Sequence, residues 1–199
     1  MAFRVSLLAL FPLVLLLPAD PAAARKPDPI PPPAPEISDA VALSRIPGSL
    51  LNEPGLQLVL DRHTRYLMVL QDGRLLRRYP AAVGTEGWET PAGRHQVLEK
   101  VSNPLWEHPG DGRTVPPGRT NPLGSRWIGF YRNCDARSNA WDGERYLSIN
   151  GCTVAGFHGT PHRWTVGRAV SHGCVRLFEE SVQEVFDLVE VGTPVTVLP

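Results

Sequence analysis

Three residues with reactive side chains stand among glycines in the last quarter of the sequence: Cys174, His158 and His172. A cysteine attacks as its thiolate, and because a free thiol has a pKa near ~8.5, we expect a neighbouring group to lower the pKa of a nucleophilic cysteine. Such a cysteine also needs a base within hydrogen-bonding reach. His158 lies on a segment separate from Cys174, as expected when base and nucleophile meet only in the fold. We predict that Cys174 is a nucleophile and His158 its general base.

The turn at His172-Gly173-Cys174 has a composition that suits an oxyanion hole. Gly173 lacks a Cβ and permits a tight backbone beside the sulfur, so that successive N–H groups can face a substrate carbonyl. We favour a structural role for His172, with a main-chain donor, over direct proton transfer.

Two other interpretations of these residues stay open. Cys174 could be a buried structural thiol, although its neighbours Ser171, His172 and Gly173 are not typical of a core. His158, His162, His172 and the cysteines could bind zinc, but the spacing contains neither a CxxC nor an HExxH element.

The N-terminal 24 residues resemble a secretory signal peptide. Arg4 supplies a positive charge, residues 5–17 are almost wholly apolar, and Ala22-Ala23-Ala24 offers a cleavage site. The alternative is an uncleaved anchor, but the apolar run is shorter than a span and contains Pro12. We predict cleavage of residues 1–24, with no stable membrane span afterwards and a periplasmic or cell-wall location. Residues 25–54 are predicted to be a proline-rich spacer whose end, from residue 36, packs loosely on the domain.

Export determines how the cysteines are interpreted. The chain has three, Cys134, Cys152 and Cys174, and disulfides persist outside the cytoplasm. A disulfide between Cys134 and Cys152 is the simplest pairing, and it leaves Cys174 free. Lys plus Arg and Asp plus Glu balance at 20 each, so no global charge favours a nucleic acid partner.

The apolar pattern predicts a mostly β domain with one late helix. Residues 56–60 and 66–70 are rich in strand formers, and Asp72-Gly73 is a hairpin signal. Further strands are predicted at 75–83, 94–101, 127–131, 146–149, 153–157 and 195–198. Residues 102–125 form a long loop, which is either functional or an ordered excursion on the surface. Val182, Val185, Phe186 and Val189 form a helical stripe that ends before Gly192.

The ordered set of motifs resembles the L,D-transpeptidase catalytic domain family (YkuD-like) over nearly all of residues 55–199. The similar elements are Val83-Gly84, Thr90-Pro91-Ala92-Gly93, Asn121-Pro122-Leu123-Gly124, His158-Gly159-Thr160, Ser171-His172-Gly173-Cys174-Val175-Arg176 and Gly192-Thr193-Pro194-Val195. The resemblance implies a β-sandwich-like fold. One departure is His95, where relatives commonly carry an aromatic residue, which puts the local core packing in question.

The resemblance also implies roles for single residues. Cys174 corresponds to the nucleophile, His158 to the base, and the carbonyl of Gly159 to the group that orients the imidazole. The amides of His172, Gly173 and Cys174 correspond to the oxyanion hole. We predict that the substrate site includes Thr160, Ser171, Arg176 and Trp164. Four tryptophans either line a substrate groove or anchor the core: Trp106, Trp127, Trp141 and Trp164, of which Trp164 is the best groove candidate. We assign three other rings to the surface or to packing: His63, His108 and Trp88.

The activity implied by the resemblance is acyl transfer between peptidoglycan stems. Cys174 would attack the carbonyl after the third stem residue, release D-alanine, and pass the acyl group to an amine of a second stem as a 3→3 cross-link. No cofactor or metal is expected, and carbapenems are expected to acylate Cys174. The alternatives are hydrolysis of the same acyl-enzyme by an L,D-carboxypeptidase, transfer to a protein lysine, and a non-catalytic wall-binding module.

Overall fold

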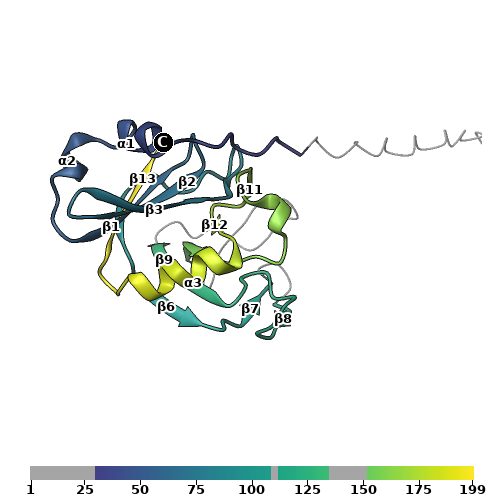
Figure 1. The fold of residues 1–199 in the computed structure, drawn as a ribbon. Coiled ribbons are helices and arrows are strands. Elements are labelled where there is room, and N and C mark those ends of the chain that lie inside the picture. The colour runs from purple at the N-terminus through teal and green to yellow at the C-terminus, as the bar shows by residue number, and fades with distance from the viewer. Residues whose placement is uncertain (1–29, 109–111, 135–151) are drawn as a thin grey trace, which may run out of the picture.

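The computed structural model describes residues 30–108, 112–134 and 152–199 (Figure 1). The predicted signal peptide, the predicted strand at 146–149 and Trp141 lie outside these residues.

One sheet has five strands in the order β3-β2-β1-β13-β5. The strands are β1 (Leu56–Asp61), β2 (Tyr66–Gln71), β3 (Arg74–Pro80), β5 (Gly93–Gln96) and β13 (Pro194–Leu198). Leu58 and Leu60 of β1 face the main core, whereas Val59 faces a second, smaller core. Because both faces are covered here, the inner strand β2 is a continuous apolar run rather than an alternating one.

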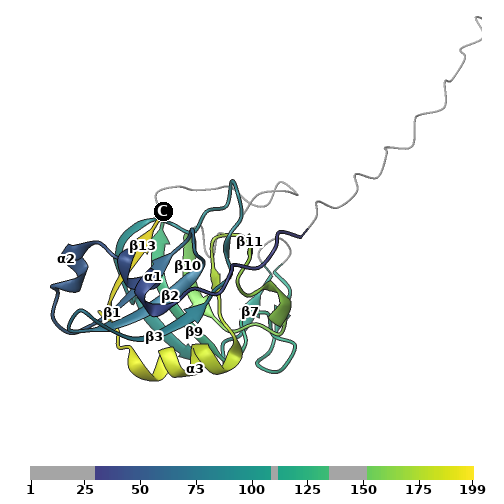
Figure 2. The ribbon, with the colours of Figure 1, turned by 45° about the horizontal axis from the view of Figure 1, so that its top comes forward.

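The second sheet has four strands in the order β12-β10-β9-β6. They are β6 (Glu99–Ser102), β9 (Arg126–Asn133), β10 (Thr153–His158) and β12 (Val175–Arg176). Helix α3 (Glu179–Leu188) packs against β9 and β10, and its buried valines join a core shared by both sheets. Figures 1 and 2 show the two sheets as separate layers with α3 running along the second. The predicted mostly β, sandwich-like fold with a late helix is confirmed.

The shorter elements connect these layers. They are β4 (Val83–Gly84) paired with β11 (Ala169–Ser171), β7 (Trp106–Glu107) paired with β8 (Thr114–Val115), and the 3-10 helix η1 (Arg163–Thr165).

Two helices occupy part of the predicted spacer. α1 (Asp39–Ser44) and α2 (Gly48–Leu51) cover the outer face of the first sheet. Ala42, Ile46 and Leu50 are buried there against Val59 and Met68. The expectation of loose packing was therefore wrong for this segment, because the short helices supply the apolar cover that the outer face of the sheet requires.

The segment predicted as one strand at 94–101 is two strands in different sheets. β5 pairs with β13, and β6 pairs with β9. At the corner between them, the amide of Val97 donates to Thr193 in one sheet and the amide of Leu98 donates to Gly129 in the other. Apolar alternation cannot reveal such a corner, since the side chains continue to alternate through it. The predicted strand at 75–83 is likewise split into β3 and β4.

The described part of the loop at 102–125 is ordered around Asn121, which is fully buried. Its amide nitrogen donates to the carbonyls of Pro104 (2.8 Å), Val115 (3.1 Å) and Pro116 (3.2 Å). Its oxygen accepts from the amide of Leu123 (2.8 Å). A single buried side chain thus ties the two ends of the loop together.

Across the described ranges, no helix has the length and apolar character needed to cross a membrane.

Candidate active site

The pairing of β10 with β12 brings together two segments that carry predicted site residues. His158 lies directly opposite Arg176 in this parallel pair, and Cys174 immediately precedes β12. Burial is the largest influence on three pKa values near Arg176: it lowers those of His158 and His172 and raises that of Cys174, while the positive charge of Arg176 acts to lower all three. These four residues therefore form one electrostatic unit, which we call the Arg176 cluster.

The imidazole of His158 is buried and held from two sides. Its Nδ1 lies 2.6 Å from the carbonyl oxygen of Gly159. Because a carbonyl can only accept, Nδ1 carries the proton and Nε2 is left to act as a base. The indole of Trp127 stacks on the other side, with ring centroids 6.1 Å apart and an angle of 29° between the planes. The predicted orienting role of the Gly159 carbonyl agrees with this geometry.

Burial lowers the pKa of His158 to about 4, and the charge of Arg176 acts in the same direction, against the hydrogen bond to Gly159. The imidazole is therefore neutral at neutral pH. This is the protonation state that a general base requires.

The thiol of Cys174 departs from the sequence expectation. Burial raises its pKa, although a main-chain hydrogen bond from Gly156 and the charge of Arg176 oppose the shift. The expected lowering of this pKa was wrong, because a neutral His158 supplies no positive charge and desolvation disfavours the thiolate. The thiol of Cys174 and the imidazole of His158 are thus both neutral at neutral pH.

Ser171 closes the turn that presents Cys174. Its hydroxyl donates to the carbonyl of Cys174 and accepts from the amide of Gly173 (3.2 Å). Gly173 has φ of 104°, a region that L side chains rarely adopt. The Gly173 amide is engaged inside the turn, and the oxyanion role of the amides of His172 and Cys174 stays a prediction.

The hydroxyls of Thr160 and Ser171 are engaged in local turns, and contact of these residues with substrate stays a prediction. Both are buried, with 3% and 1% of their surfaces exposed. The Thr160 hydroxyl accepts from the amide of His162 (3.1 Å), so it closes a turn after the base as Ser171 does before the nucleophile.

Trp164 is 55% exposed on η1, between the two site segments. The guanidinium of the preceding Arg163 pairs with Glu180 of α3 (2.8 Å) and lies 4.3 Å from the ring centre of Phe178. The tip that carries Trp164 is therefore anchored to α3. Contact of Trp164 with substrate stays a prediction.

Trp88, assigned above to the surface or to packing, packs against one of the predicted site residues. Its ring lies edge-on to His172, with centroids 4.9 Å apart. The loop that carries it is tied to the catalytic turn, because the amide of Thr85 donates to the carbonyl of Ser171 (3.0 Å). Its place between the Val83-Gly84 and Thr90-Pro91 motifs was the one signal available.

The Asn121-Pro122-Leu123-Gly124 motif passes close to Gly159, the residue that follows His158. A Cβ on Gly124, where φ is 65°, would lie 2.8 Å from the Cα of Gly159. A Cβ on either glycine would also collide with the carboxylate of Glu179, which accepts from the amide of Ser125 (2.9 Å). Two glycines are therefore required where this loop passes under the residue that orients His158.

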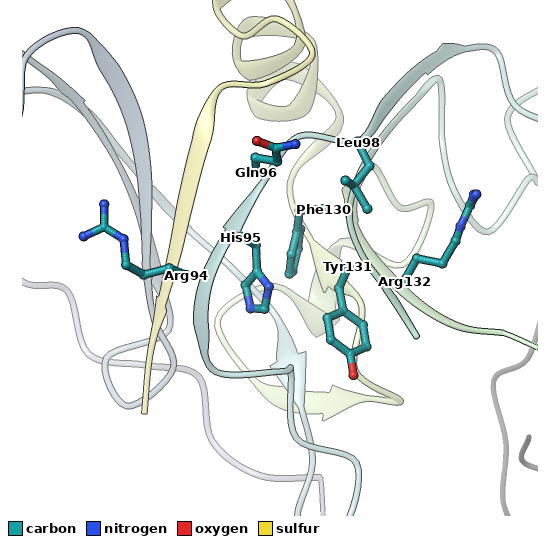
Figure 3. A pocket seen from close by; sticks show the side chains of 7 residues that line it. All are labelled: Arg94, His95, Gln96, Leu98, Phe130, Tyr131 and Arg132. Atoms are coloured by element: carbon teal, nitrogen blue, oxygen red, sulfur yellow. The ribbon is translucent and has the colours of Figure 1, made fainter. Parts of the chain in front are cut away.

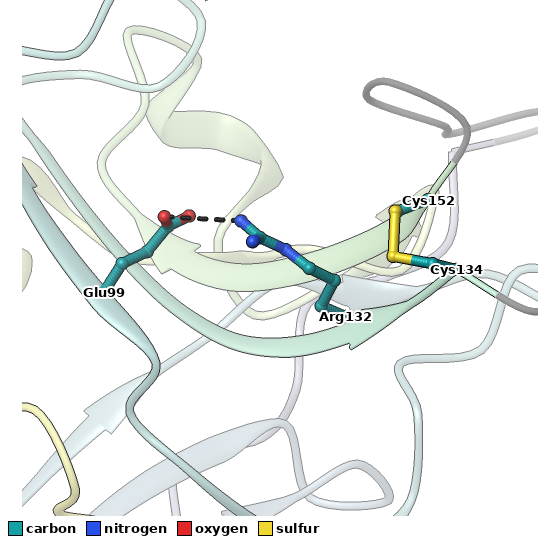
Figure 4. The surroundings of a disulfide bond; sticks show 4 residues. All are labelled: Glu99, Arg132, Cys134 and Cys152. Atoms are coloured by element: carbon teal, nitrogen blue, oxygen red, sulfur yellow. Dashed lines mark hydrogen bonds and ion pairs between the residues drawn. A yellow bond between two sulfur atoms is a disulfide. The ribbon is translucent and has the colours of Figure 1, made fainter.

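Cys134 and Cys152 are joined by a disulfide, and Cys174 is a free cysteine (Figure 4). Within the described residues, no group of three or more His, Cys, Asp and Glu side chains is arranged to hold a metal ion. The zinc interpretation of His158, His162, His172 and Cys174 thus finds no ligand set in this part of the chain.

His95 replaces an aromatic residue in packing as well as in position. Its ring centroid lies 5.6 Å from those of both Phe130 and Tyr131, and its Nε2 lies 3.1 Å from the carbonyl of Pro91. These side chains line a hollow of about 480 Å³ between β5 and β9 (Figure 3). The core packing around His95 is therefore preserved, because the imidazole packs as an aromatic ring.

The sequence matches the L,D-transpeptidase catalytic domain family, YkuD, over residues 56–197. YqjB of Bacillus subtilis, which bears an L,D-transpeptidase name, is 33% identical over 141 residues, covering 70% of this chain and 69% of that protein. ErfK/SrfK of Salmonella typhimurium, also named as an L,D-transpeptidase, is 30% identical over 60% of this chain and 36% of its own length.

Solved structures share the fold at lower identity. The catalytic domain of an L,D-transpeptidase from E. faecium, acylated by ertapenem, aligns with a TM-score of 0.51 at 21% identity, covering 73% of this chain and 98% of that one. L,D-transpeptidase 3 from Mycobacterium tuberculosis, in complex with a faropenem-derived adduct, aligns with a TM-score of 0.52 at 19% identity, covering 73% and 61%.

Proposed function

This chain belongs to the L,D-transpeptidase catalytic domain family, and we propose that it cross-links peptidoglycan stem peptides through an acyl-enzyme on Cys174. The observation that carries the proposal is the arrangement of His158, whose buried, neutral imidazole has Nδ1 fixed by Gly159 and lies in one electrostatic cluster with the free Cys174. A base with one nitrogen fixed and the other free is what activation of a thiol needs.

In the first step, Nε2 of His158 takes the thiol proton as the sulfur attacks the carbonyl after the third stem residue. The negative charge that develops on the carbonyl oxygen is held by the main-chain amides of Cys174 and His172, with the positive charge of Arg176 nearby. The tetrahedral intermediate collapses, the C–N bond breaks, and His158 returns the proton to the amine of the departing D-alanine.

In the second step, His158 deprotonates an amine of a second stem, which attacks the thioester carbonyl. The C–S bond breaks, the sulfur takes back the proton from His158, and a 3→3 cross-link results. With water as the acceptor, the same acyl-enzyme yields an L,D-carboxypeptidase, and with a protein lysine it attaches a protein to the wall.

Arg176 and Trp164 are the residues we assign to the substrate. Within the described residues, no carboxylate forms an ion pair with Arg176, even though its guanidinium lies among the site groups. A half-buried cation of this kind suits the carboxylates of a stem peptide. Trp164 offers an exposed aromatic face at the rim.

We further propose that the protein acts outside the cytoplasm, in the periplasm or cell wall. Residues 1–24 serve as the export signal, residues from 25 to the start of α1 as a proline-rich spacer, and the rest as the catalytic domain. The Cys134–Cys152 disulfide supports this location, since such bonds persist in oxidising compartments.

The test is mass spectrometry of the purified protein incubated with a disaccharide-tetrapeptide, beside a Cys174→Ala variant. We expect a 3→3 dimer with the wild type and none with the variant. Tripeptide without dimer would instead identify the carboxypeptidase. An unchanged substrate, with folded protein that retains it in a binding assay, would identify the wall-binding module.

Carbapenem acylation provides a second, independent test. Because the strained ring resembles an acyl donor, we expect the intact mass of the protein to increase by one carbapenem, and the Cys174→Ala variant to stay unmodified. An unmodified wild type, or a variant that is modified equally, would contradict the assignment of Cys174.

A further inference from the structure

Trp127 on β9 contacts residues of the two neighbouring strands, His158 on β10 and Glu99 on β6. Trp127 is 8% exposed and lies directly opposite His158 in the β9–β10 pair, so the two side chains leave the sheet on the same face. Their rings stack with centroids 6.1 Å apart. The indole is therefore a direct neighbour of the catalytic imidazole.

Two glycines leave the space that the indole occupies. A Cβ on Gly156 would lie 2.7 Å from Cη2 of Trp127, and a Cβ on Gly129 would lie 3.0 Å from its Nε1. Real Cβ atoms essentially never show the first distance, and the second is tighter than nearly all real Cβ contacts. The indole thus lies against bare backbone at both ends, and Gly156 is also the residue whose main chain hydrogen bonds to the thiol of Cys174.

The orientation of the indole is fixed by Glu99 on β6. The indole N–H donates to a carboxylate oxygen of Glu99 (2.9 Å), and the other oxygen of Glu99 lies 3.4 Å from Arg132 (Figure 4). Glu99 is opposite Gly129, and its Cγ would lie 2.9 Å from a Cβ there. The same glycine therefore accommodates both partners of this hydrogen bond.

We propose that Trp127, held in place by Glu99, is a positioning residue for the general base. The hydrogen bond to Gly159 fixes Nδ1 of His158 but leaves the ring free to tilt about that contact. The indole, whose own orientation Glu99 sets, limits that tilt and keeps water from one face of the imidazole. Nε2 is thereby held in one orientation, as the proposed transfer of the thiol proton requires. This inference rests on the proposed role of His158 as the base.

The test uses variants that change either the indole of Trp127 or the hydrogen bond that it donates to Glu99. Glu99→Ala removes the acceptor, Glu99→Gln keeps an oxygen that can accept, and Trp127→Phe keeps a ring but removes the N–H. The Glu99 side chain is 42% exposed, so its replacement leaves the fold intact. Glu53→Ala is the matched control, because it breaks a comparable surface pair, with Arg94, on the other sheet.

The first readout is the rate at which iodoacetamide alkylates Cys174 in the whole purified chain, which needs no peptidoglycan substrate. We expect Glu99→Ala and Trp127→Phe to slow alkylation about tenfold, because small misplacements of a catalytic group are costly. With substrate, kcat should fall by a similar factor while KM changes less than about twofold. Glu99→Gln should recover most of the rate, and Glu53→Ala should match the wild type.

The second readout is the titration of His158 followed by NMR. In the wild type the pKa is about 4. If the indole shields the imidazole, Glu99→Ala and Trp127→Phe should raise this value toward the ordinary 6.5. A purely structural role for Trp127 would lower the melting temperature without moving the titration.

Two outcomes would overturn the proposal in distinguishable ways. Wild-type rates and an unmoved His158 titration in both Glu99→Ala and Trp127→Phe would refute the positioning role alone, provided that His158→Gln is alkylated slowly. Alkylation of His158→Gln at the wild-type rate would refute the role of His158 as base, and with it both the proposed function and this inference.

Discussion

The pKa values of His158 and Cys174 are displaced in opposite directions, and burial is the main cause of both displacements. An imidazolium and a thiolate would each lose more hydration on burial than the neutral groups do. We therefore expect the proton to move from sulfur to nitrogen during attack on the substrate rather than before it. The amides of Cys174 and His172 then stabilise the charge once it has reached the substrate oxygen.

The lowered pKa of His158 predicts an acidic limit for the reaction. The imidazole of His158 is deprotonated above a pH of about 4 rather than above a pH of 6.5. The rate of carbapenem acylation at mildly acidic pH should therefore equal the rate at neutral pH. The acylation rate should fall to half only as the pH approaches the pKa of His158 in the folded protein. The measurement is the acylation rate by stopped-flow absorbance against pH. A midpoint near 6.5 would show that the imidazole is not desolvated as the structure indicates.

At the scale of elements, strand register and glycine contacts decide the site. His158 meets Arg176 and Trp127 because β10 pairs with β12 on one side and with β9 on the other. A register shift between Ala155 and Gly156 accompanies the close approach of the indole to Gly156. The site thus depends on the irregular part of the second sheet.

The contact between Gly124 and Gly159 leads to a prediction about the loop under the base. Gly124→Ala should reduce acylation strongly, since its Cβ would meet Gly159 and the carboxylate of Glu179. Gly87→Ala is the matched control, because Gly87 also has positive φ, 79°, but has no atom within 4 Å of the added Cβ. Both should lose stability of about 1 kcal/mol from backbone strain. Equal acylation rates in the two variants would contradict the prediction.

Asn121 should govern the stability of the same loop. Asn121→Ala leaves three carbonyls and the Leu123 amide without their partner, so we expect unfolding to become easier by about 2–3 kcal/mol. Asn52→Ala, which removes one exposed hydrogen bond to Gly48, should change the free energy of unfolding by less than about 0.5 kcal/mol. Urea denaturation measures both, and similar values would argue against the central role of Asn121.

At the scale of the whole molecule, the helices α1 and α2 are part of the folded unit. Arg45, which caps α1, pairs with the fully buried Asp61 at the end of β1. The same carboxylate accepts from the amides of His63 (2.9 Å) and Thr64 (3.2 Å). One carboxylate therefore joins the helical cover to the first hairpin of the sheet.

The Arg45–Asp61 pair predicts how stability depends on pH. Burial raises the pKa of Asp61, but the hydrogen bonds from Arg45 and Thr64 outweigh it and leave the pKa below 3.8. A carboxyl whose folded pKa is lowered stabilises the fold above its unfolded pKa, and this contribution is lost as the pH falls through the folded value. Arg45→Ala should therefore cost about 2 kcal/mol at neutral pH. Without Arg45 the folded pKa of Asp61 is lowered less, so this variant should lose less stability than the wild type as the pH falls into the acidic range.

Thermal unfolding across the acidic range measures this effect, with Arg94→Ala as control. Arg94 pairs with Glu53 at an exposed position, so its loss should leave both the melting temperature and its pH dependence close to those of the wild type. Parallel behaviour of the two variants would show that Asp61 does not depend on Arg45.

The sequence by itself determined the reactive groups and the secondary structure near them. Cys174, His158 and Gly159 could be selected because their motifs are local, and the hairpin at Asp72-Gly73 because its positive φ values, 51° and 74°, are a local requirement. Strands such as β1 and β2 follow from apolar runs, and α3 from a stripe of valines.

Only the tertiary structure decided what surrounds those groups. The raised pKa of Cys174 follows from burial, which depends on what packs around the thiol. The stacking of Trp127 on His158 follows from cross-strand register, and the division of residues 94–101 between two sheets follows from which strands they meet. Each is a contact between segments distant in sequence, and neither motif nor periodicity carries information about such partners.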